Sequence, residues 1–156
     1  MVLTRADAVV WGAARRAAGE TIVFTNGVFD LLHPGHVRYL QDARQLGDAL
    51  IVAVNSDRSA RALDKGPDRP LNAQDERAEL LAALACVDAV VIFDEDTPYE
   101  IVNDLQPDVL VKGADWAEGT IVGADIVKAR GGRVARIPLA NGYSTTRILE
   151  AIKRPG

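Results

Sequence analysis

Short apolar runs alternate with amphipathic stretches along most of this chain. Residues 50–54 form an uninterrupted apolar run, which is typical of a strand covered on both faces of a sheet. Similar runs predict strands at residues 21–25, 87–93, 109–111 and 133–137. Because the stretches between them predict helices, the strands are expected to lie parallel, joined by right-handed crossovers. The pattern therefore predicts a three-layer α/β fold with a five-stranded parallel sheet and helices on both faces.

The ends of the predicted helices carry capping signals. Thr4 is placed to cap a first helix that continues through Arg16. The face expected to be buried carries Val9, Val10, Ala13 and Ala17. Pro34 begins a second helix, which runs to about Leu46 before Gly47. Further helices are expected from Asn72 or Asp75 to Ala85, from Thr97 to Leu105, and from Ser144 or Thr145 to Ile152.

Composition fits one globular domain over residues 1–156, with an amino-terminal helix in 1–18 and a core in 20–152. The chain is 48% hydrophobic and 26% charged, with a formal net charge of -4. This acidic balance argues against a nucleic-acid binder, which carries a basic stripe. No apolar run approaches the roughly 20 residues that span a bilayer, and the first residues lack the pattern of a secretion signal. We therefore expect a cytoplasmic protein that binds small molecules and neither nucleic acid nor membrane.

Both histidines of the chain lie in one tetrapeptide, His33-Pro34-Gly35-His36, at a predicted strand-to-helix turn. Residues three apart share a helix face, so the two imidazoles can face the same ligand. The start of the helix adds free N–H groups and a positive dipole end, which favour an anion. This equipment suits a polyphosphate. The alternative is a pair of surface histidines beside a Pro-Gly turn.

A second helix start carries three consecutive hydroxyl groups, Ser144, Thr145 and Thr146. They can cap the helix and also donate to phosphate oxygens, although ordinary capping needs only one of them. In a parallel sheet, ligands bind beyond the carboxyl ends of the strands. We expect the two helix starts to converge at that edge on a shared phosphate site.

Glycines and cations supply further candidates near the same edge. Gly27 and Gly35 permit close backbone approach to a ligand, or they only relieve turn strain. Residues 64–71 are the least regular segment and a candidate mobile loop; they contain Lys65 and Arg69, and a lysine in such a loop can swing over phosphates. Taken singly, these two cations, like Arg58, Arg77 and Lys112, fit a solvated surface as well as a site.

Several familiar sites are missing from the sequence. It contains neither a GxxxxGK[ST] phosphate loop nor a GxGxxG fingerprint, which argues against a P-loop kinase and an ordinary dinucleotide dehydrogenase. A Ser-His-Asp triad is not indicated, because both histidines are already assigned. A protein-held zinc ion needs more ligands than this pair, so no metal ligand is predicted.

The tetrapeptide and the stretch YSTTRI at residues 143–148 resemble the first and the closing motif of the HxGH nucleotidyltransferase superfamily of Rossmann-like enzymes. The resemblance extends from about Glu20 to Ile152. Within the superfamily, the stretches TNGVFDLLH, AVNSD, DEDTP and PDVLVKG resemble the D-glycero-β-D-manno-heptose 1-phosphate adenylyltransferases. This resemblance implies transfer of AMP from ATP to the heptose 1-phosphate, giving ADP-heptose and pyrophosphate. The chain resembles a stand-alone form supplied by a separate kinase.

The same resemblance implies roles for particular residues. Catalysis by direct in-line attack is expected to use His33, His36 and Lys65. The implied nucleotide site, with adenine over Gly35, comprises Thr25, Asn26, Gly27, Phe29, Gly35, Lys112, Gly113, Asp115, Tyr143, Ser144, Thr145 and Thr146. The candidates for the sugar phosphate are Asp30, Asn55 and Arg77, with Asp30 accepting from sugar hydroxyls and Arg77 binding the phosphate. Mg²⁺ is expected on the triphosphate, and relatives are commonly homo-oligomers.

Glycerol-3-phosphate cytidylyltransferases also look similar, including the stretch GADW at residues 113–116. Their usual arginine ahead of the closing motif is replaced here by Leu139, which favours ATP. Arg136 lies nearby, so a cytidylyl- or guanylyltransferase acting on another sugar or polyol phosphate stays open as the alternative. A different class of function is also considered: a nucleotide-binding sensor that binds the nucleotide but catalyses no reaction.

Overall fold

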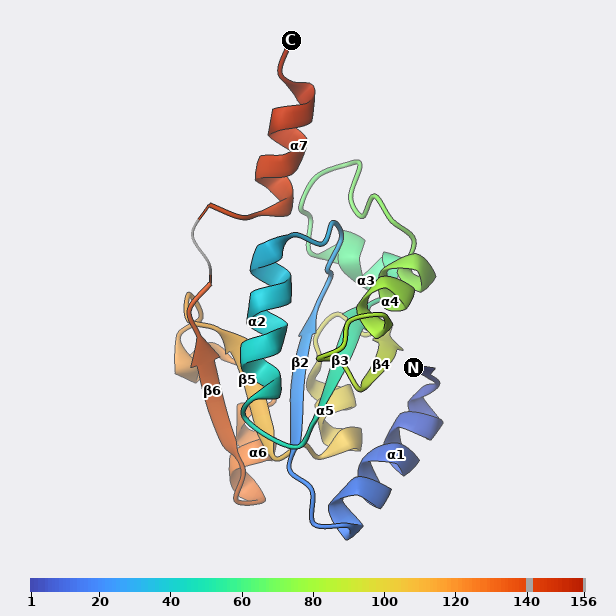
Figure 1. The fold of residues 1–156 in the computed structure, drawn as a ribbon, viewed down its shortest axis with the longest axis vertical. Helices are drawn as coiled ribbons and strands as arrows, with labels where there is room; N and C mark the ends of the chain where they lie inside the picture. The colour runs from blue at the N-terminus through green and yellow to red at the C-terminus, as the bar shows by residue number, and fades with distance from the viewer. Residues whose placement is uncertain (140–141, 156) are drawn as a thin grey trace.

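The computed structural model of the protein describes residues 1–139 and 142–155, apart from the side chain of Glu118. Within these residues, six strands form one parallel sheet in the order β1-β4-β3-β2-β5-β6 (Figure 1). In that order, the strands are Val2–Leu3, Ala89–Phe93, Ala49–Asn55, Ile22–Gly27, Val109–Gly113 and Arg133–Ile137. The chain leaves β2 toward β3 on one side and returns to β5 on the other. The strand order therefore reverses between β2 and β5, where such sheets bind ligands.

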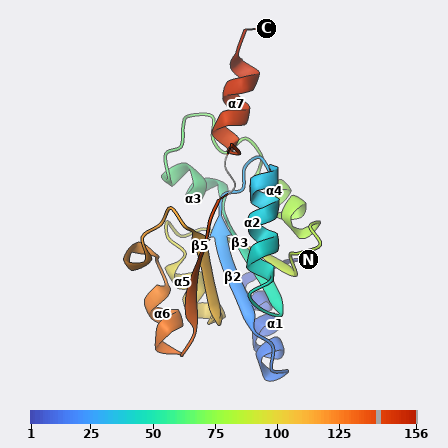
Figure 2. The same ribbon diagram turned by 60° about the vertical axis from the view of Figure 1, so that its left-hand side comes forward.

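Helices cover both faces of the sheet (Figure 2). The helices α1 (Arg5–Ala17), α5 (Tyr99–Leu105) and α6 (Ala124–Ala129) pack on one face. The helices α2 (Pro34–Arg44) and α4 (Gln74–Ala82) pack on the other. The remaining helices are α3 (Asp57–Ala62), α7 (Thr145–Lys153), which projects beyond the carboxyl edge of the sheet, and the short 3₁₀ helix η1 (Glu118–Thr120). The three-layer arrangement predicted from the sequence is confirmed.

The strands bury their side chains on both faces because neighbouring residues point to opposite sides. Phe24 and Ile51 contribute to the core beneath α1 and α5, whereas Val23 and Leu50 contribute to the core beneath α2 and α4. All seven residues of β3 are buried, as its uninterrupted apolar run predicts. No helix in the described part of the chain is long and apolar enough to span a membrane.

The sheet has six strands rather than the predicted five. The additional strand, β1, consists of two residues, and it exists because Val2 and Leu3 pair with Val90 and Val91 of β4. A pairing between residues so far apart in the chain leaves no periodic pattern. The short helices α3 and α6 were not predicted either, because a helix of 6 residues is too short to show a period.

The buried face of α1 differs from the predicted one. Ala8 and Gly12 are buried, whereas Val10 is 68% exposed. A Cβ at position 12 would lie 3.7 Å from Ile22 Cδ1 and 3.9 Å from the Leu105 carbonyl oxygen. The helix therefore packs closely through small residues, which a search for large apolar side chains overlooks. Its start is as predicted, since Thr4 Oγ1 accepts from the Asp7 backbone N–H at 3.1 Å.

The start of α4 also departs from the sequence prediction. Neither Asn72 nor Asp75 caps it; Ala73 is the N-cap residue, and its backbone N–H donates to Glu76 Oε2 at 3.2 Å. Asn72 is used elsewhere, because its backbone and side-chain N–H groups both donate to Asp30. This contact ties the irregular loop to the segment after β2.

Candidate functional site

A cavity of about 370 Å³ opens at the carboxyl edge of the sheet, next to the point where the strand order reverses. Its walls come from the ends of β2 and β5, the starts of α2 and α7, and the loop between α3 and α4. The lining residues are Asn26, Gly27, Val28, Phe29, Asp30, His33, Gly35, His36, Tyr39, Lys65, Arg69, Lys112, Gly113, Asp115, Trp116, Leu139, Tyr143, Ser144, Thr145 and Thr146.

His33 and His36 hold each other in one orientation at the start of α2. His33 is the N-cap residue, and its Nδ1 accepts from the His36 backbone N–H at 3.3 Å. In return, His36 Nδ1 accepts from the His33 backbone N–H at 3.4 Å. The two rings stack with their centroids 3.8 Å apart. Because each Nδ1 is an acceptor, each neutral ring carries its proton on Nε2 and can donate it to a ligand.

Both imidazoles are neutral at physiological pH. Burial is the main cause that lowers the pKa of His36 to about 4; the proximity of His33 and Lys65 contributes in the same direction, and the Leu31 carbonyl acts in the opposite direction. Burial also lowers the pKa of His33. The pair therefore offers two neutral N–H donors to a ligand.

The start of α7 lies against this histidine pair. Thr145 Oγ1 donates to the Leu31 carbonyl at 3.1 Å, which joins α7 to the segment that leads into α2. The Tyr143 ring lies parallel to the His33 ring, with the centroids 6.1 Å apart. A Cβ on Gly35 would lie 2.9 Å from Tyr143 Cβ, so only a glycine fits there without displacement. The two helix starts thus meet in one cavity.

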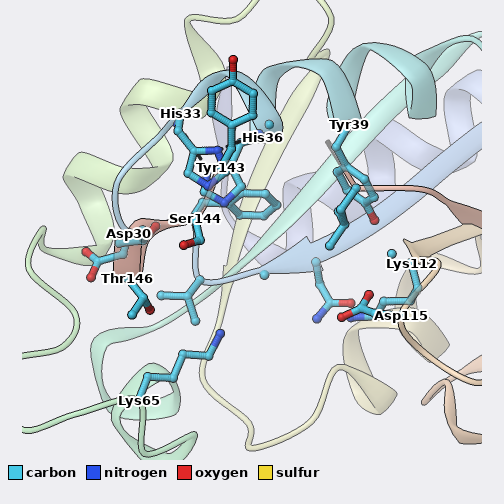
Figure 3. A pocket seen from close by; sticks show the side chains of 18 of the residues that line it. Asp30, His33, His36, Tyr39, Lys65, Lys112, Asp115, Tyr143, Ser144 and Thr146 are labelled. Atoms are coloured by element: carbon cyan, nitrogen blue, oxygen red, sulfur yellow. Dashed lines mark hydrogen bonds between the residues drawn. The ribbon is translucent and has the colours of Figure 1, made fainter. Parts of the chain in front are cut away.

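The opposite end of the cavity is formed by the end of β5 (Figure 3). Burial lowers the pKa of Lys112 to about 8, with Asp115 opposing and Lys65 adding to the shift. The Lys112 ammonium lies 5.4 Å from the centre of the Trp116 ring. A Cβ on Gly113 would lie 2.5 Å from Asp115 Oδ1, so a side chain there would displace the Asp115 carboxylate. Together with Leu139, this end offers apolar, flat surfaces next to polar groups.

Most of the residues predicted for the site line this cavity. The exceptions are Thr25, Asn55 and Arg77. Thr25 is fully buried inside the fold, where its hydroxyl contacts Tyr39 Oη at 2.8 Å and the Val111 carbonyl at 3.0 Å. It holds Tyr39, which does line the cavity. Its position corrects the prediction that Thr25 contacts the nucleotide.

Arg77 lies behind the cavity wall rather than in it. Its side chain is fully buried. The guanidinium donates to three backbone carbonyls, those of Val28, Asn55 and Asn72, and to the Asp57 carboxylate, all at 2.8 to 2.9 Å. These acceptors occupy the guanidinium, so Arg77 does not reach a bound phosphate as predicted. It braces the segments that surround the site.

Asn55 and Asp30 are also committed to protein contacts. Asn55 Nδ2 donates to Ser59 Oγ at 2.9 Å, away from the cavity, which corrects its predicted contact with the sugar phosphate. Asp30 lines the cavity, but its carboxylate accepts from Arg69 Nε at 2.7 Å and from the backbone N–H of Leu71 at 2.8 Å. Asp30 therefore fastens the loop instead of standing free for hydroxyl groups.

Sequence reasoning did not assign Val28, Tyr39, Arg69, Trp116 and Leu139 to the site, although they line the cavity. Tyr39 follows His36 by three residues on the same helix, so its position was accessible from helical spacing. The sequence identifies Arg69 only as a cation of the irregular loop. Trp116 and Leu139 reach the site through the packing of the segments after β5 and β6. This packing cannot be predicted from a local sequence pattern.

A parallel sheet with a histidine pair and a second helix start at its switch point is the arrangement of a nucleotidyltransferase, and it places this chain in that class. The chain belongs to the cytidylyltransferase-like family, whose sequence model matches residues 24–151.

Relatives extend the similarity. Bifunctional protein HldE of Syntrophotalea carbinolica is 59% identical over 137 residues, which is 88% of this chain and 28% of that protein. Bifunctional protein HldE of Geobacter sulfurreducens is 54% identical over 140 residues, 90% of this chain and again 28% of the relative. The chain thus spans little more than a quarter of the length of these relatives. The crystal structure of the lipopolysaccharide core biosynthesis protein from Thermoplasma volcanium is 30% identical, with a TM-score of 0.69, and covers 79% of this chain and 100% of that one.

Proposed function

We propose that this protein transfers AMP from ATP to D-glycero-D-manno-heptose 1-phosphate, giving ADP-heptose and pyrophosphate. The observation that carries the proposal is the pair of neutral imidazoles, fixed through their Nδ1 atoms, beside a second helix start in one cavity. The similarity to the HldE proteins and to a lipopolysaccharide core biosynthesis protein supports the choice of a heptose phosphate.

The reaction is a single in-line displacement. A phosphate oxygen of the sugar attacks the α-phosphorus of ATP, the bond from this phosphorus to the bridging oxygen breaks, and pyrophosphate leaves with the bond electrons. The attacking group is already an anion, so no strong base is needed. The work of the site is to align two anions and to stabilise the charge that builds on the phosphoryl oxygens.

Each chemical task has candidate residues in the cavity. His33 and His36 would donate their Nε2–H groups to the α-phosphoryl oxygens. Lys65 would add a positive charge from the loop; its ammonium points toward the interior of the cavity (Figure 3). The first N–H groups of α7, with the hydroxyls of Ser144 and Thr146, would hold the β- and γ-phosphates.

The base and the metal ion complete the proposal. Adenine would lie beside Gly35 and toward Gly113, with Leu139 as an apolar contact. No cluster of three His, Cys, Asp or Glu side chains that could hold a metal ion exists among residues 1–139 and 142–155. Mg²⁺ would therefore arrive on the triphosphate and keep most of its water ligands.

The remaining features of the proposal concern the whole chain. Residues 1–156 would act as one domain, since a single sheet links the described residues. We further propose that the protein acts in the cytoplasm as a homo-oligomer. Light scattering after size exclusion would give its mass in solution.

A panel of four nucleoside triphosphates against several sugar phosphates tests the reaction, with pyrophosphate release as the readout. We expect release with ATP, Mg²⁺ and the heptose 1-phosphate. Preference for CTP or GTP, or for another polyol phosphate, would establish the alternative transferase. ATP binding without release for any acceptor would identify a sensor. Leu139 favours ATP, because an apolar side chain against Gly113 supplies no donor for a pyrimidine carbonyl.

The histidine pair gives the same proposal a second test. His33→Ala and His36→Ala should each lower kcat by about 10²- to 10³-fold, the loss seen when one preorganised donor is removed from a transition state. ATP affinity, measured by calorimetry, should change little. Near-normal turnover in both variants would refute the catalytic assignment.

A further inference from the structure

Arg69 is a cation at the cavity whose orientation is fixed by a buried carboxylate. The side chain of Asp30 is completely buried, and its Oδ2 accepts from Arg69 Nε at 2.7 Å. The backbone N–H groups of Leu71 and Asn72 donate to the same carboxylate at 2.8 and 3.0 Å. Asp30 therefore holds both the guanidinium and the chain that follows it.

The guanidinium of Arg69 has hydrogen-bond donors that the ion pair with Asp30 does not use. Only its Nε contacts a protein acceptor, and within residues 1–139 and 142–155 no acceptor contacts its two terminal amino groups. The side chain is 13% exposed, and the residue lines the cavity. An oriented, largely desolvated guanidinium with both terminal amino groups available is suited to a phosphate, which it binds through two parallel hydrogen bonds.

The same loop carries a second cation, Lys65, which also lines the cavity. The Arg69 backbone N–H donates to the Gly66 carbonyl at 3.2 Å, which closes a turn immediately after Lys65. The charge of Lys65 lowers the pKa of both His36 and Lys112, so its ammonium interacts electrostatically with groups on both sides of the cavity. The loop thus supplies two cations on the wall that neither helix start forms.

Two phosphorylated substrates need two sets of positive groups. In the proposed reaction, the helix starts and the histidines serve the triphosphate, and the end of β5 with Lys112 and Asp115 serves the base. Asp30 lies at the end of the cavity far from Lys112 and Asp115 (Figure 3), and Arg69 lies with it. The phosphate of the acceptor is the anion left without a partner.

We propose that Arg69, oriented by Asp30, binds the phosphate group of the sugar phosphate acceptor. The inference rests on the proposed adenylyl transfer and deepens it by naming the residue that recognises the second substrate. It replaces Arg77, whose guanidinium is already bound to protein acceptors. Asp30 is then a positioning residue that acts through Arg69.

Steady-state kinetics of Arg69→Gln and Arg69→Lys, with ATP and acceptor varied separately, test the proposal. Loss of hydrogen bonds to a charged group should raise the KM for the acceptor about 10- to 100-fold in Arg69→Gln. The KM for ATP should stay within about twofold, because ATP binds elsewhere. The acceptor KM of Arg69→Lys should lie between those of the wild type and Arg69→Gln, since lysine keeps the charge but cannot form two parallel hydrogen bonds.

Arg58→Gln is the matched control, because Arg58 is an exposed arginine of α3 that pairs with Asp94 and Asp96 outside the cavity. It should leave both KM values unchanged. Asp30→Asn should raise the acceptor KM in the wild-type background and add little in Arg69→Gln, the signature of action through Arg69. Far-ultraviolet circular dichroism would verify that each variant is folded.

Two kinetic outcomes overturn the proposal. A rise in the ATP KM with an unchanged acceptor KM would assign Arg69 to the triphosphate, and unchanged values for both would remove it from the site. If heptose 1-phosphate fails as a substrate of the wild type, the proposed function fails, and Arg69 is judged on the acceptor that the panel identifies. If no acceptor turns over, calorimetry is used to compare the binding of heptose 1-phosphate to the wild type and to Arg69→Gln. Weaker binding to Arg69→Gln supports the proposal, and equal or absent binding refutes it.

Discussion

At the scale of single residues, the site depends on side chains whose freedom has been removed. His33 and His36 exchange hydrogen bonds through their backbone N–H groups, which fixes the tautomer of both rings. Their burial keeps them neutral, so they can approach one another and a cationic loop without repulsion. Preorganised neutral donors need no rearrangement when charge develops on a phosphoryl group.

The lowered pKa of His36 predicts a dependence of stability on pH. Its pKa is about 4 in the folded protein and about 6.5 in the unfolded chain. Between these values the unfolded chain binds more protons, so the free energy of unfolding should fall as the pH drops from 6.5 toward 4. His36→Gln should lose less stability than the wild type over this range.

Urea denaturation at pH 7 and pH 5 measures this difference. His33 and the carboxylates titrate in both proteins, so the comparison isolates His36. An equal loss of stability in the two proteins would show that His36 is not held neutral by the fold.

At the scale of elements, function is concentrated at two helix starts. The start of α2 supplies the imidazoles and the start of α7 supplies Ser144 and Thr146, while Thr145 fastens one to the other through Leu31. The contact between them passes over Gly35, where a side chain would collide with Tyr143 and with the His33 ring. The two helices can approach only because this position has no Cβ.

Gly35→Ala should therefore lower activity although alanine is the better helix former by about 1 kcal/mol. The new Cβ would lie 2.9 Å from Tyr143 Cβ and from His33 Nδ1, so one of these groups must move. Small displacements of catalytic groups cost up to about 10²-fold in rate. We expect kcat to fall at least about tenfold.

Gly119→Ala is the matched control, since a Cβ at that position meets no atom within 4 Å in the part of the chain that the structure describes. It should keep normal pyrophosphate release. If Gly35→Ala is equally active, the close approach of the two helix starts is not needed for catalysis.

At the scale of the whole molecule, Arg77 joins the segments that surround the cavity. Its acceptors lie after β2, at the end of β3, at the start of α3 and at the end of the irregular loop. Removing a buried charge while leaving its partners in place is strongly destabilising. We expect Arg77→Met to lower the free energy of unfolding by about 3–5 kcal/mol.

Urea denaturation would measure this loss, with Arg58→Met as a control of equal charge change. Arg58 forms exposed ion pairs with Asp94 and Asp96, so its replacement should alter stability little. Comparable losses in the two variants would contradict the bracing role of Arg77.

The sequence by itself determined the alternation of strands and helices, the parallel sheet, and the two helix starts that carry the histidines and the hydroxyls. These features follow from neighbouring residues, because burial on both faces, helical spacing and capping are local properties. It identified most of the cavity lining for the same reason, since the carboxyl ends of parallel strands share one edge.

Only the tertiary structure decided which side chains face that edge. Asp30 and Arg69 are 39 residues apart, Val28 and Arg77 are 49 apart, and Leu31 and Thr145 are 114 apart. Each pair forms because folding brings distant segments together, and a polar group takes whichever partner satisfies it there. The sequence therefore shows that arginines are present near the site, and the packing determines that Arg77 braces the fold while Arg69 faces the cavity.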